Sequence, residues 1–481
     1  MAFGYSRSSI EIFVESVFAI RGMLNSLKFL QSLLAVWCVM IGVTVVAEGN
    51  WPSFRGEKAA GVGDGPYLPE IMDAESGKGL LYKVRVPGLA HSSPIVWQDR
   101  LFLTTAVSKD ADASFKPGLY GSGDASKDRS VHQWKILCLN KNNGDLLWER
   151  TATQGKPIDK RHIKSTYANS TPCTDGKVVV AWFGSQGVFA YDLQGKLLWE
   201  HKMQRMDVGA YDLPSYEWGP ASSPILHSGR VILQVDTQGK DYLIALDAKT
   251  GRTIWKTDRE ELPSWGTPTI VFTKDRTEVV TNGSNFIKAY DFETGKEIWR
   301  LGGSSKITAP TPVHAKGVTI VASGRAPESP IFAIRDGAKG DISLAKGQSS
   351  NASVAWRHNK RGPYMPSPLI YGDNVYILHN GGIFAAYDLQ SGKEHFIRRV
   401  PHEGYGFSAS PVASNGRIFL PGEDGILLEM QSGNEYRHVR THKIGEPLMA
   451  SPAISEGILF LRGRDHLFAF CKKSEDTTAN E

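Results

Sequence analysis

Cysteine is scarce in this chain of 481 residues, and its four cysteines are widely separated. The sequence has no Cys-x-x-C pair, which excludes a zinc knuckle, a thioredoxin-like redox pair and the attachment motif of a c-type haem. Three cysteines follow residue 47: Cys138, Cys173 and Cys471. We expect buried free thiols in strands, and one disulfide stays open as an alternative if the compartment is oxidising.

Catalytic motifs and runs of one charge are also missing. We find no G-x-S-x-G, no H-E-x-x-H and no phosphate-binding G-x-x-x-x-G-K-[ST]; His402-Glu403 lacks the second histidine of a zinc site. The 55 Lys and Arg residues nearly balance the 50 Asp and Glu residues, and no dense basic run occurs. The sequence therefore predicts no catalytic set, no metal site and no nucleic-acid partner.

Long apolar runs are rare, and one lies near the N-terminus, from Phe29 to Val46. Lys28 precedes it, and Val45 and Ala47 are the small residues that a signal peptidase requires before its cleavage site. Residues 1–47 are therefore predicted to be a signal peptide, with Met23 as a possible true start, and the mature protein to be periplasmic or extracellular. The alternative is an uncleaved anchor, the one case in which we expect contact with a membrane.

Glycine is abundant, with 49 residues, and the chain repeats itself. A small residue, a proline and a short apolar strand recur eight times, at Pro94, Pro172, Pro224, Pro268, Pro312, Pro368, Pro411 and Pro452. Two apolar runs with a turn of Gly, Asp, Asn or Ser between them follow most of these prolines, a pattern typical of a β-hairpin. Proline suits the first position of a strand, where no ladder hydrogen bond is lost.

A second element closes most repeats, with Ala-x-Asp followed by Gly and then Trp. It is clearest from Ala245 to Trp255 and from Ala289 to Trp299. Asp opens the turn, and Gly takes a positive φ that other residues avoid. The aromatic residue is expected to pack against the neighbouring repeat, which predicts structural struts at Trp148, Trp199, Trp255, Trp299 and Trp356.

Four short strands per repeat, eight times, predict an all-β fold: an eight-bladed β-propeller of four-stranded antiparallel blades. A β-solenoid or two sandwiches are the alternatives. The last repeat has three strands, so we expect Leu80–Val86 to supply its fourth strand and close the ring. The predicted division is a lead-in segment over 48–79, the propeller over 80–472 and a polar tail over 473–481. Long inserts after Val107 and after Ile334 are expected to be surface loops.

The A-x-D-x-x-T-G-x-x-x-W pattern resembles the pyrroloquinoline-quinone (PQQ)-type propeller repeat. The opening Trp51-Pro-Ser-Phe-Arg-Gly56 and the HSSP that begins at His91 are similar to those of secreted PQQ-like propeller proteins of planctomycete-type bacteria. Two families share this repeat: the quinoprotein alcohol dehydrogenases, and the assembly propeller of the Bam complex, which binds partners without catalysis. The resemblance is specific for the fold and weak for the function.

The dehydrogenase alternative implies PQQ and calcium. It requires adjacent cysteines over the quinone and usually a haem attachment motif, and the sequence has neither. Asn169, Glu217 and Asp236 are of the type that a calcium set needs, but their spacing does not distinguish them. We therefore favour a non-catalytic binding or scaffold module without a cofactor.

The segments just before each inner strand are expected to meet at one mouth of the central channel. They are rich in aromatic residues and Met, which suits a protein or peptide partner or a small ligand. The alternative is that they simply plug the channel. The candidate binding residues are His162, Lys164, Tyr167, Glu217, Trp218, Trp265, Lys306, Tyr364 and Tyr405.

Overall fold

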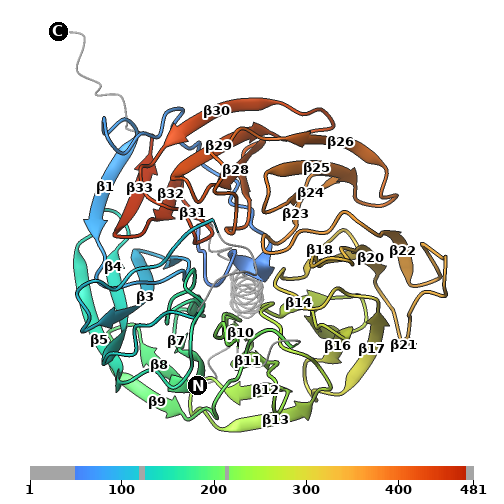
Figure 1. Ribbon diagram of the computed structural model, residues 1–481, viewed down its shortest axis with the longest axis horizontal. Coiled ribbons are helices and arrows are strands. Elements are labelled where there is room, and N and C mark those ends of the chain that lie inside the picture. The colour runs from blue at the N-terminus through green and yellow to red at the C-terminus, as the bar shows by residue number, and fades with distance from the viewer. Residues whose placement is uncertain (1–48, 119–124, 212–215, 473–481) are drawn as a thin grey trace, which may run out of the picture. The chain divides into compact units, whose positions relative to one another are not determined.

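The computed structural model describes residues 49–118, 125–211 and 216–472, and the predicted signal peptide and tail lie outside these residues. Eight β-sheets surround a central channel (Figure 1), which confirms the predicted eight-bladed propeller. Each blade places its first strand beside the channel and its last strand at the rim. None of the described helices is long and apolar enough to cross a membrane.

The first four blades follow one another in chain order. Blade 1 contains β2 (Ile95–Trp97), β3 (Arg100–Ser108), β4 (His132–Asn140) and β5 (Leu146–Gly155). Blade 2 contains β6 (Cys173–Thr174), β7 (Val178–Trp182), β8 (Val188–Asp192) and β9 (Leu197–His201), with the short 3-10 helix η2 (Gly184–Gln186) between β7 and β8. Blade 3 contains β10 (Ile225–His227), β11 (Arg230–Val235), β12 (Tyr242–Asp247) and β13 (Thr253–Asp258). Blade 4 contains β14 (Thr269–Phe272), β15 (Thr277–Thr281), β16 (Phe286–Asp291) and β17 (Glu297–Gly302).

The remaining blades complete the circle. Blade 5 contains β18 (Val313–Ala315), β19 (Val318–Ala322), β20 (Ile331–Arg335) and β22 (Val354–His358). Blade 6 contains β23 (Leu369–Tyr371), β24 (Asn374–Leu378), β25 (Ile383–Asp388) and β26 (Glu394–Arg399). Blade 7 contains β27 (Val412–Ser414), β28 (Arg417–Pro421), β29 (Ile426–Gln431) and β30 (His438–Lys443). Blade 8 contains β31 (Ala453–Ser455), β32 (Ile458–Arg462), β33 (His466–Cys471) and β1 (Leu80–Arg85).

Ring closure follows the predicted route. Strand β1 pairs antiparallel with β33, with Lys83 opposite Phe468 and Val84 opposite Leu467. The last blade therefore combines three C-terminal strands with the first strand of the chain. Because β1 covers the edge of β33, the ring closes without a free edge at this position.

The hydrophobic core is distributed between blades rather than gathered at one centre. Each large apolar cluster is shared by neighbouring blades, such as the cluster of Trp199, Leu233 and Ile244 between blades 2 and 3. The middle strands are buried on both faces because each blade is covered by two neighbours, whereas an outermost strand such as β13 is mostly exposed and buries its tryptophan. This arrangement allows a long chain to bury its apolar residues without enlarging any one core.

The predicted struts lie at these interfaces, and four of the five cover a glycine in the following blade. The ring of Trp255 covers Gly295, where a Cβ would lie 2.5 Å from a ring carbon, and its indole N–H donates to the carbonyl of Phe292. The same pairing joins Trp148 to Gly195, Trp199 to Gly251 and Trp356 to Gly392, and Tyr82 takes the tryptophan's place against Gly144. Because a side chain at these glycines would enter the aromatic ring, the turn and the strut require each other.

Trp299 packs between blades 4 and 5 but bonds differently from the other struts. Its indole N–H donates to Glu278 in its own blade, at 3.0 Å, rather than to a carbonyl of the next blade. The reason is the insert in blade 5, which replaces the tight turn there. This insert was expected to be a surface loop, but it contributes β21 (Gly340–Asp341), which pairs in parallel with β17 as a fifth strand of blade 4.

A segment before β1 crosses the channel, and we call residues 51–62 the plug. Trp51 forms a bridge with Val96 of blade 1, the 3-10 helix η1 (Glu57–Ala59) lies against β14 and β18, and Val62 forms a bridge with Ala413 of blade 7. Figure 1 shows this segment in blue at the centre of the ring. The plug therefore closes the channel between three sides of the propeller.

Two of the three cysteines within the described residues, Cys138 and Cys173, are buried free thiols in strands, as predicted. Cys138 and Cys173 are buried in β4 and β6, and Cys471 is partly buried at the end of β33. Burial raises the pKa of the Cys138 thiol to about 12, so this thiol stays protonated and unreactive at neutral pH.

Candidate functional site: the channel mouth

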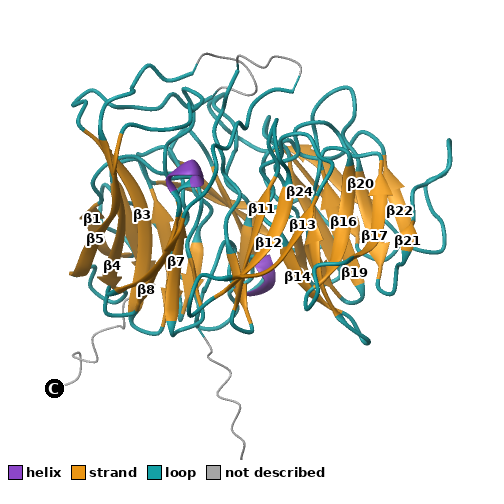
Figure 2. Cartoon of the chain, turned by 90° about the horizontal axis from the view of Figure 1, so that it is seen from below, coloured by secondary structure: helices purple, strands orange, loops and turns teal. Residues whose placement is uncertain are grey.

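The channel contains a cavity of about 220 Å³ at the end where the segments preceding the inner strands meet. Phe54 of the plug contributes to its lining, so the cavity does not run through the ring. Apolar and aromatic side chains dominate the upper wall: Trp218, Trp265, Ile307, Tyr364, Met365 and Met449. In Figure 2 the long loops gather along the upper edge of the ring.

Two tryptophans form the main aromatic surface of this cavity. The rings of Trp218 and Trp265 lie 5.7 Å apart at a tilt of 38°. The indole N–H of Trp265 donates to the carbonyl of Gly219 at 2.8 Å, and His162 meets Trp218 edge to face at 6.1 Å. These contacts fix the rings, so they offer a rigid apolar surface with little rotamer freedom to lose.

A buried ion pair spans the mouth from blade 2 to blade 7. The ammonium of Lys164 lies 2.7 Å from a carboxylate oxygen of Glu423, and both side chains are buried. Glu423 also accepts hydrogen bonds from the Ser408 hydroxyl and the backbone N–H of Gly118. Burial lowers the pKa of Lys164, and the neighbouring Glu423 opposes this shift.

The first insert packs over the mouth instead of standing free of it. Lys116 and Ser126 donate backbone hydrogen bonds to the carbonyls of Ile163 and Arg161. The guanidinium of Arg161 is buried and donates to the carbonyls of Ser165 and Ser114. The described parts of this insert therefore cover one side of the cavity.

Below the aromatic residues, a ring of hydroxyls lines the channel. Each belongs to the Ser or Thr before a repeat's proline, and each accepts the backbone N–H of the equivalent residue in the preceding repeat. The seven contacts are 2.9–3.3 Å long and involve the hydroxyls of Thr171, Ser223, Thr267, Thr311, Ser367, Ser410 and Ser451. We call these seven residues the hydroxyl ring.

Five of the nine predicted binding residues line the cavity: His162, Lys164, Trp218, Trp265 and Tyr364. The other four lie elsewhere. Tyr167 packs against His132 and Trp134, and Lys306 donates to Asn285 at 2.8 Å. Glu217 pairs with Arg205 at 2.6 Å, and Tyr405 is exposed beside Gly118.

Sequence reasoning did not single out the hydroxyl ring, Phe54 or Ile307 as site residues. A signal for the ring was present, because a small residue precedes each of the eight repeat prolines. Phe54 could not be found in this way, since only the path of the plug across the channel brings it to the cavity.

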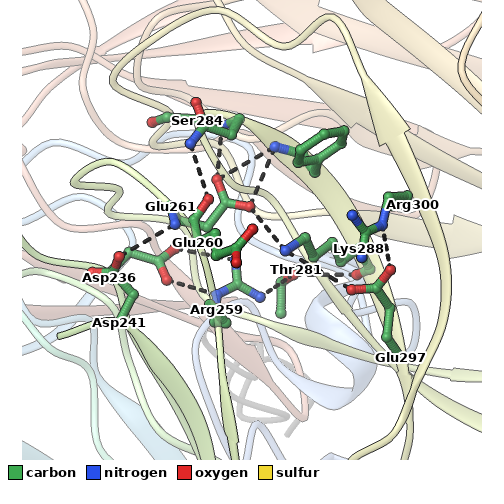
Figure 3. A network of polar contacts seen from close by, with 12 residues as sticks. Asp236, Asp241, Arg259, Glu260, Glu261, Thr281, Ser284, Lys288, Glu297 and Arg300 are labelled. Atoms are coloured by element: carbon green, nitrogen blue, oxygen red, sulfur yellow. Dashed lines mark hydrogen bonds and ion pairs between the residues drawn. The ribbon is translucent and has the colours of Figure 1, made fainter.

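The three residues considered for a calcium set do not fit that role. The carboxylate of Asp236 forms a fully buried pair with Arg259 at 2.7 Å, part of the network between blades 3 and 4 in Figure 3. Glu217 is neutralised by Arg205, and the amide of Asn169 donates to Ser165 and to the carbonyl of Pro220. Within the described residues, no group of three or more His, Cys, Asp or Glu side chains could hold a metal ion. Asn169, Glu217 and Asp236 therefore do not form a calcium site of the type that a quinone-dependent dehydrogenase needs.

Comparison with known proteins places the fold and the family. Residues 62–240 and 239–477 match the family model described as outer membrane protein assembly factor BamB. No curated protein sequence matches the chain.

Solved structures share the architecture at low identity. The computationally designed Ika8 protein is 14% identical, with a TM-score of 0.52 over 82% of this chain and 99% of that one. The quinohemoprotein alcohol dehydrogenase ADHIIG from Pseudomonas putida HK5 is 11% identical, with a TM-score of 0.51 over 90% of this chain and 82% of that one. BamB from Moraxella catarrhalis is 14% identical, with a TM-score of 0.49 over 76% of this chain and 98% of that one. The family model spans nearly all of the propeller, and the chain therefore belongs to the BamB family of PQQ-like β-propellers.

Proposed function

We propose that this protein is an exported, non-catalytic binding module that takes a small ligand, or one side chain of a protein partner, into its channel mouth. The observation that carries the proposal is the cavity at the channel mouth with Trp218 and Trp265 in its wall. Rigid aromatic rings give a large contact area at a low entropic cost, which is typical of binding hot spots.

The size of the cavity supports a small occupant. Its volume of about 220 Å³ lies below the ~300–1,000 Å³ usual for sites that enclose a drug-sized ligand. A side chain or a small organic molecule suits this space better than a large cofactor. The family description, an outer membrane assembly factor, favours a protein as the source of that group and favours export.

The chemistry of the lining supports binding without catalysis. No Cys, Asp or Glu within the described ranges lines the cavity, and Lys164 is engaged by Glu423. The Nε2 atom of His91 lies 2.8 Å from the carbonyl of Lys164, and burial lowers the pKa of this histidine to about 4. An imidazole with so low a pKa is a weak proton acceptor, and it is therefore a poor general base at neutral pH.

Ligand-observed NMR with small aromatic probes and N-acetylated dipeptide amides tests the proposal. We expect Trp265→Ala to weaken probe binding more than ~10-fold, or ~1.4 kcal/mol, because it removes half of the aromatic surface. Lys306→Ala is the matched control, since Lys306 lies before the next inner strand but does not line the cavity. A large loss of melting temperature with unchanged probe binding would show that the aromatic residues only pack the channel.

A second measurement addresses the dehydrogenase alternative. Absorbance spectra of the purified protein with added PQQ and Ca²⁺ should show no stoichiometric complex. A tight one-to-one complex with turnover of an alcohol would overturn the non-catalytic assignment.

A further inference from the structure

The hydroxyl ring has a chemical property beyond holding the blades together. Each of its seven oxygens accepts a backbone N–H, yet none of these hydroxyls donates its own proton to an acceptor within the described part of the chain. All seven side chains belong to residues less than 5% exposed, and all seven line the cavity. The channel therefore presents a circle of O–H donors without protein acceptors.

A second observation lies in the plug. Arg55 is fully buried, and its Nε, Nη1 and Nη2 atoms have no hydrogen-bond partner among the described residues. Burial lowers the pKa of Arg55 to about 9, so the guanidinium is still charged at neutral pH. Its neighbour Phe54 lines the cavity, whereas Arg55 itself lies buried within the plug, with its guanidinium against Gly61.

Arg462 is the informative contrast, because it is also an arginine that is fully enclosed. Its Nη1 donates to the Ser92 hydroxyl at 2.9 Å and to the Thr104 carbonyl at 2.7 Å. The burial of Arg462 is thus compensated by protein acceptors, whereas that of Arg55 is not. An enclosed charge without acceptors is strongly unfavourable unless another group supplies them.

The backbone around Arg55 is shaped to admit its guanidinium. Gly61 has a φ of +70°, and a Cβ there would lie 2.5 Å from Nη2 of Arg55. The glycine therefore leaves room for the cation at the place where the plug turns toward blade 7. The backbone of the plug therefore specifies the position of the Arg55 guanidinium.

We propose that the channel binds a small oxyanion, the carboxylate or phosphate-type group of the ligand that enters the mouth. The hydroxyl ring donates to its oxygens, and Arg55 supplies the countercharge beneath the floor. Lys164 is already neutralised by Glu423, whereas the guanidinium of Arg55 has no hydrogen-bond partner among the described residues. The inference rests on the proposed function, because it specifies the chemistry of the same site's ligand.

Benzoate and its neutral isostere benzamide test the charge preference at constant ionic strength, followed by tryptophan fluorescence and by melting temperature. We expect benzoate to bind at least 10-fold more tightly than benzamide. Acetate and inorganic phosphate are the bare oxyanions, and the one that competes better with benzoate identifies the preferred head group.

Variants locate the site. Arg55→Met should weaken benzoate binding at least 10-fold and change benzamide binding less than twofold, while Arg462→Met should leave the preference for benzoate intact. Thr311→Val removes one ring hydroxyl and should weaken benzoate binding, whereas Thr311→Ser keeps the hydroxyl and should bind as the wild type does.

Two outcomes overturn the inference. Equal affinity for benzoate and benzamide would refute the oxyanion site while leaving the binding module intact. A benzoate preference that survives both Arg55→Met and Thr311→Val would place the anion outside the channel. Failure of every neutral and charged probe, with no effect of Trp265→Ala in the NMR panel, would refute the proposed function as well.

Discussion

The outer and inner rims of the propeller are built from the same repeats but use them differently. At the outer rim, tryptophan covers the turn glycine of the next blade, and both its ring and its N–H are fully used, as in Trp255. At the inner rim, each Ser or Thr hydroxyl of the ring accepts one backbone N–H from the neighbouring repeat. The O–H group of the same hydroxyl has no acceptor among the described residues. The repeated residues of the outer rim therefore use all of their hydrogen-bonding groups within the protein. The repeated hydroxyls of the inner rim leave their O–H donors available to a ligand.

The difference shows where function can arise in a repeat fold. A position that satisfies all of its atoms within the protein stabilises the ring and has nothing left for a ligand. A repeated position that leaves one group unsatisfied multiplies that group around the symmetry axis, where eight blades approach one another. The predictions below separate these two kinds of position.

Removing the N-terminal region should have the largest effect. A chain that begins at Pro87 lacks both β1 and the plug, so β33 becomes an open edge and the whole ring is destabilised. We expect a marked fall in melting temperature and association in size-exclusion chromatography. A chain that begins at Gly79 keeps β1 and loses the plug together with residues 63–78, and it should remain monomeric. An unchanged, monomeric Pro87 variant would contradict closure through β1.

Loss of one outer strut should rank next. Trp255→Ala should cost ~3–5 kcal/mol of unfolding free energy in denaturant titration, as for large aromatic residues deleted from a core. Ile254→Ala is the control, because Ile254 is 43% exposed on the same strand and should cost much less. If the two variants cost the same, the strut assignment is wrong.

The buried ion pair of Asp236 and Arg259 in blade 3 should be about as sensitive, but only when one of its two charges is removed alone. Asp236→Asn leaves the buried Arg259 without its carboxylate and should cost ~3–5 kcal/mol, whereas Asp236→Leu combined with Arg259→Met should recover much of this loss. The exposed pair of Lys316 and Asp373 is the control, and Asp373→Asn should change stability by less than ~1 kcal/mol. Additive losses in the double variant would show that the charges are not coupled.

The smallest effect concerns pH at the inner rim. Burial lowers the pKa of His91 to about 4, and the cations Lys164 and Arg462 shift it in the same direction. Because the unfolded chain takes up this proton first, stability should fall as the pH drops from ~6.5 to ~4, by up to ~3 kcal/mol. His91→Gln should remove this part of the pH dependence, measured by denaturant titration at several pH values. An equal slope in wild type and variant would assign it to other groups.

Much of the fold could be predicted because its determinants are local. The Asp-to-Gly turns, the prolines before inner strands and the missing fourth strand of the last repeat each leave a mark within a few residues. The bonding of Trp299 could not be predicted, since it depends on what the insert of blade 5 replaces. The site was predicted in part: loop position placed Trp218 and Trp265 in the cavity, but it could not tell that Lys306 turns to Asn285.

The number of blades, the phase of the strands and the closing strand follow from the sequence, because a repeated pattern of turns and apolar residues specifies one sheet after another. Which side chains share the channel depends instead on the folded ring. Phe54 reaches it because the plug crosses the ring, and Lys164 meets Glu423, which lies five blades further along the chain. These contacts form because the ring is closed. The loops of all blades converge on the central axis, so residues that are far apart in the sequence lie side by side there.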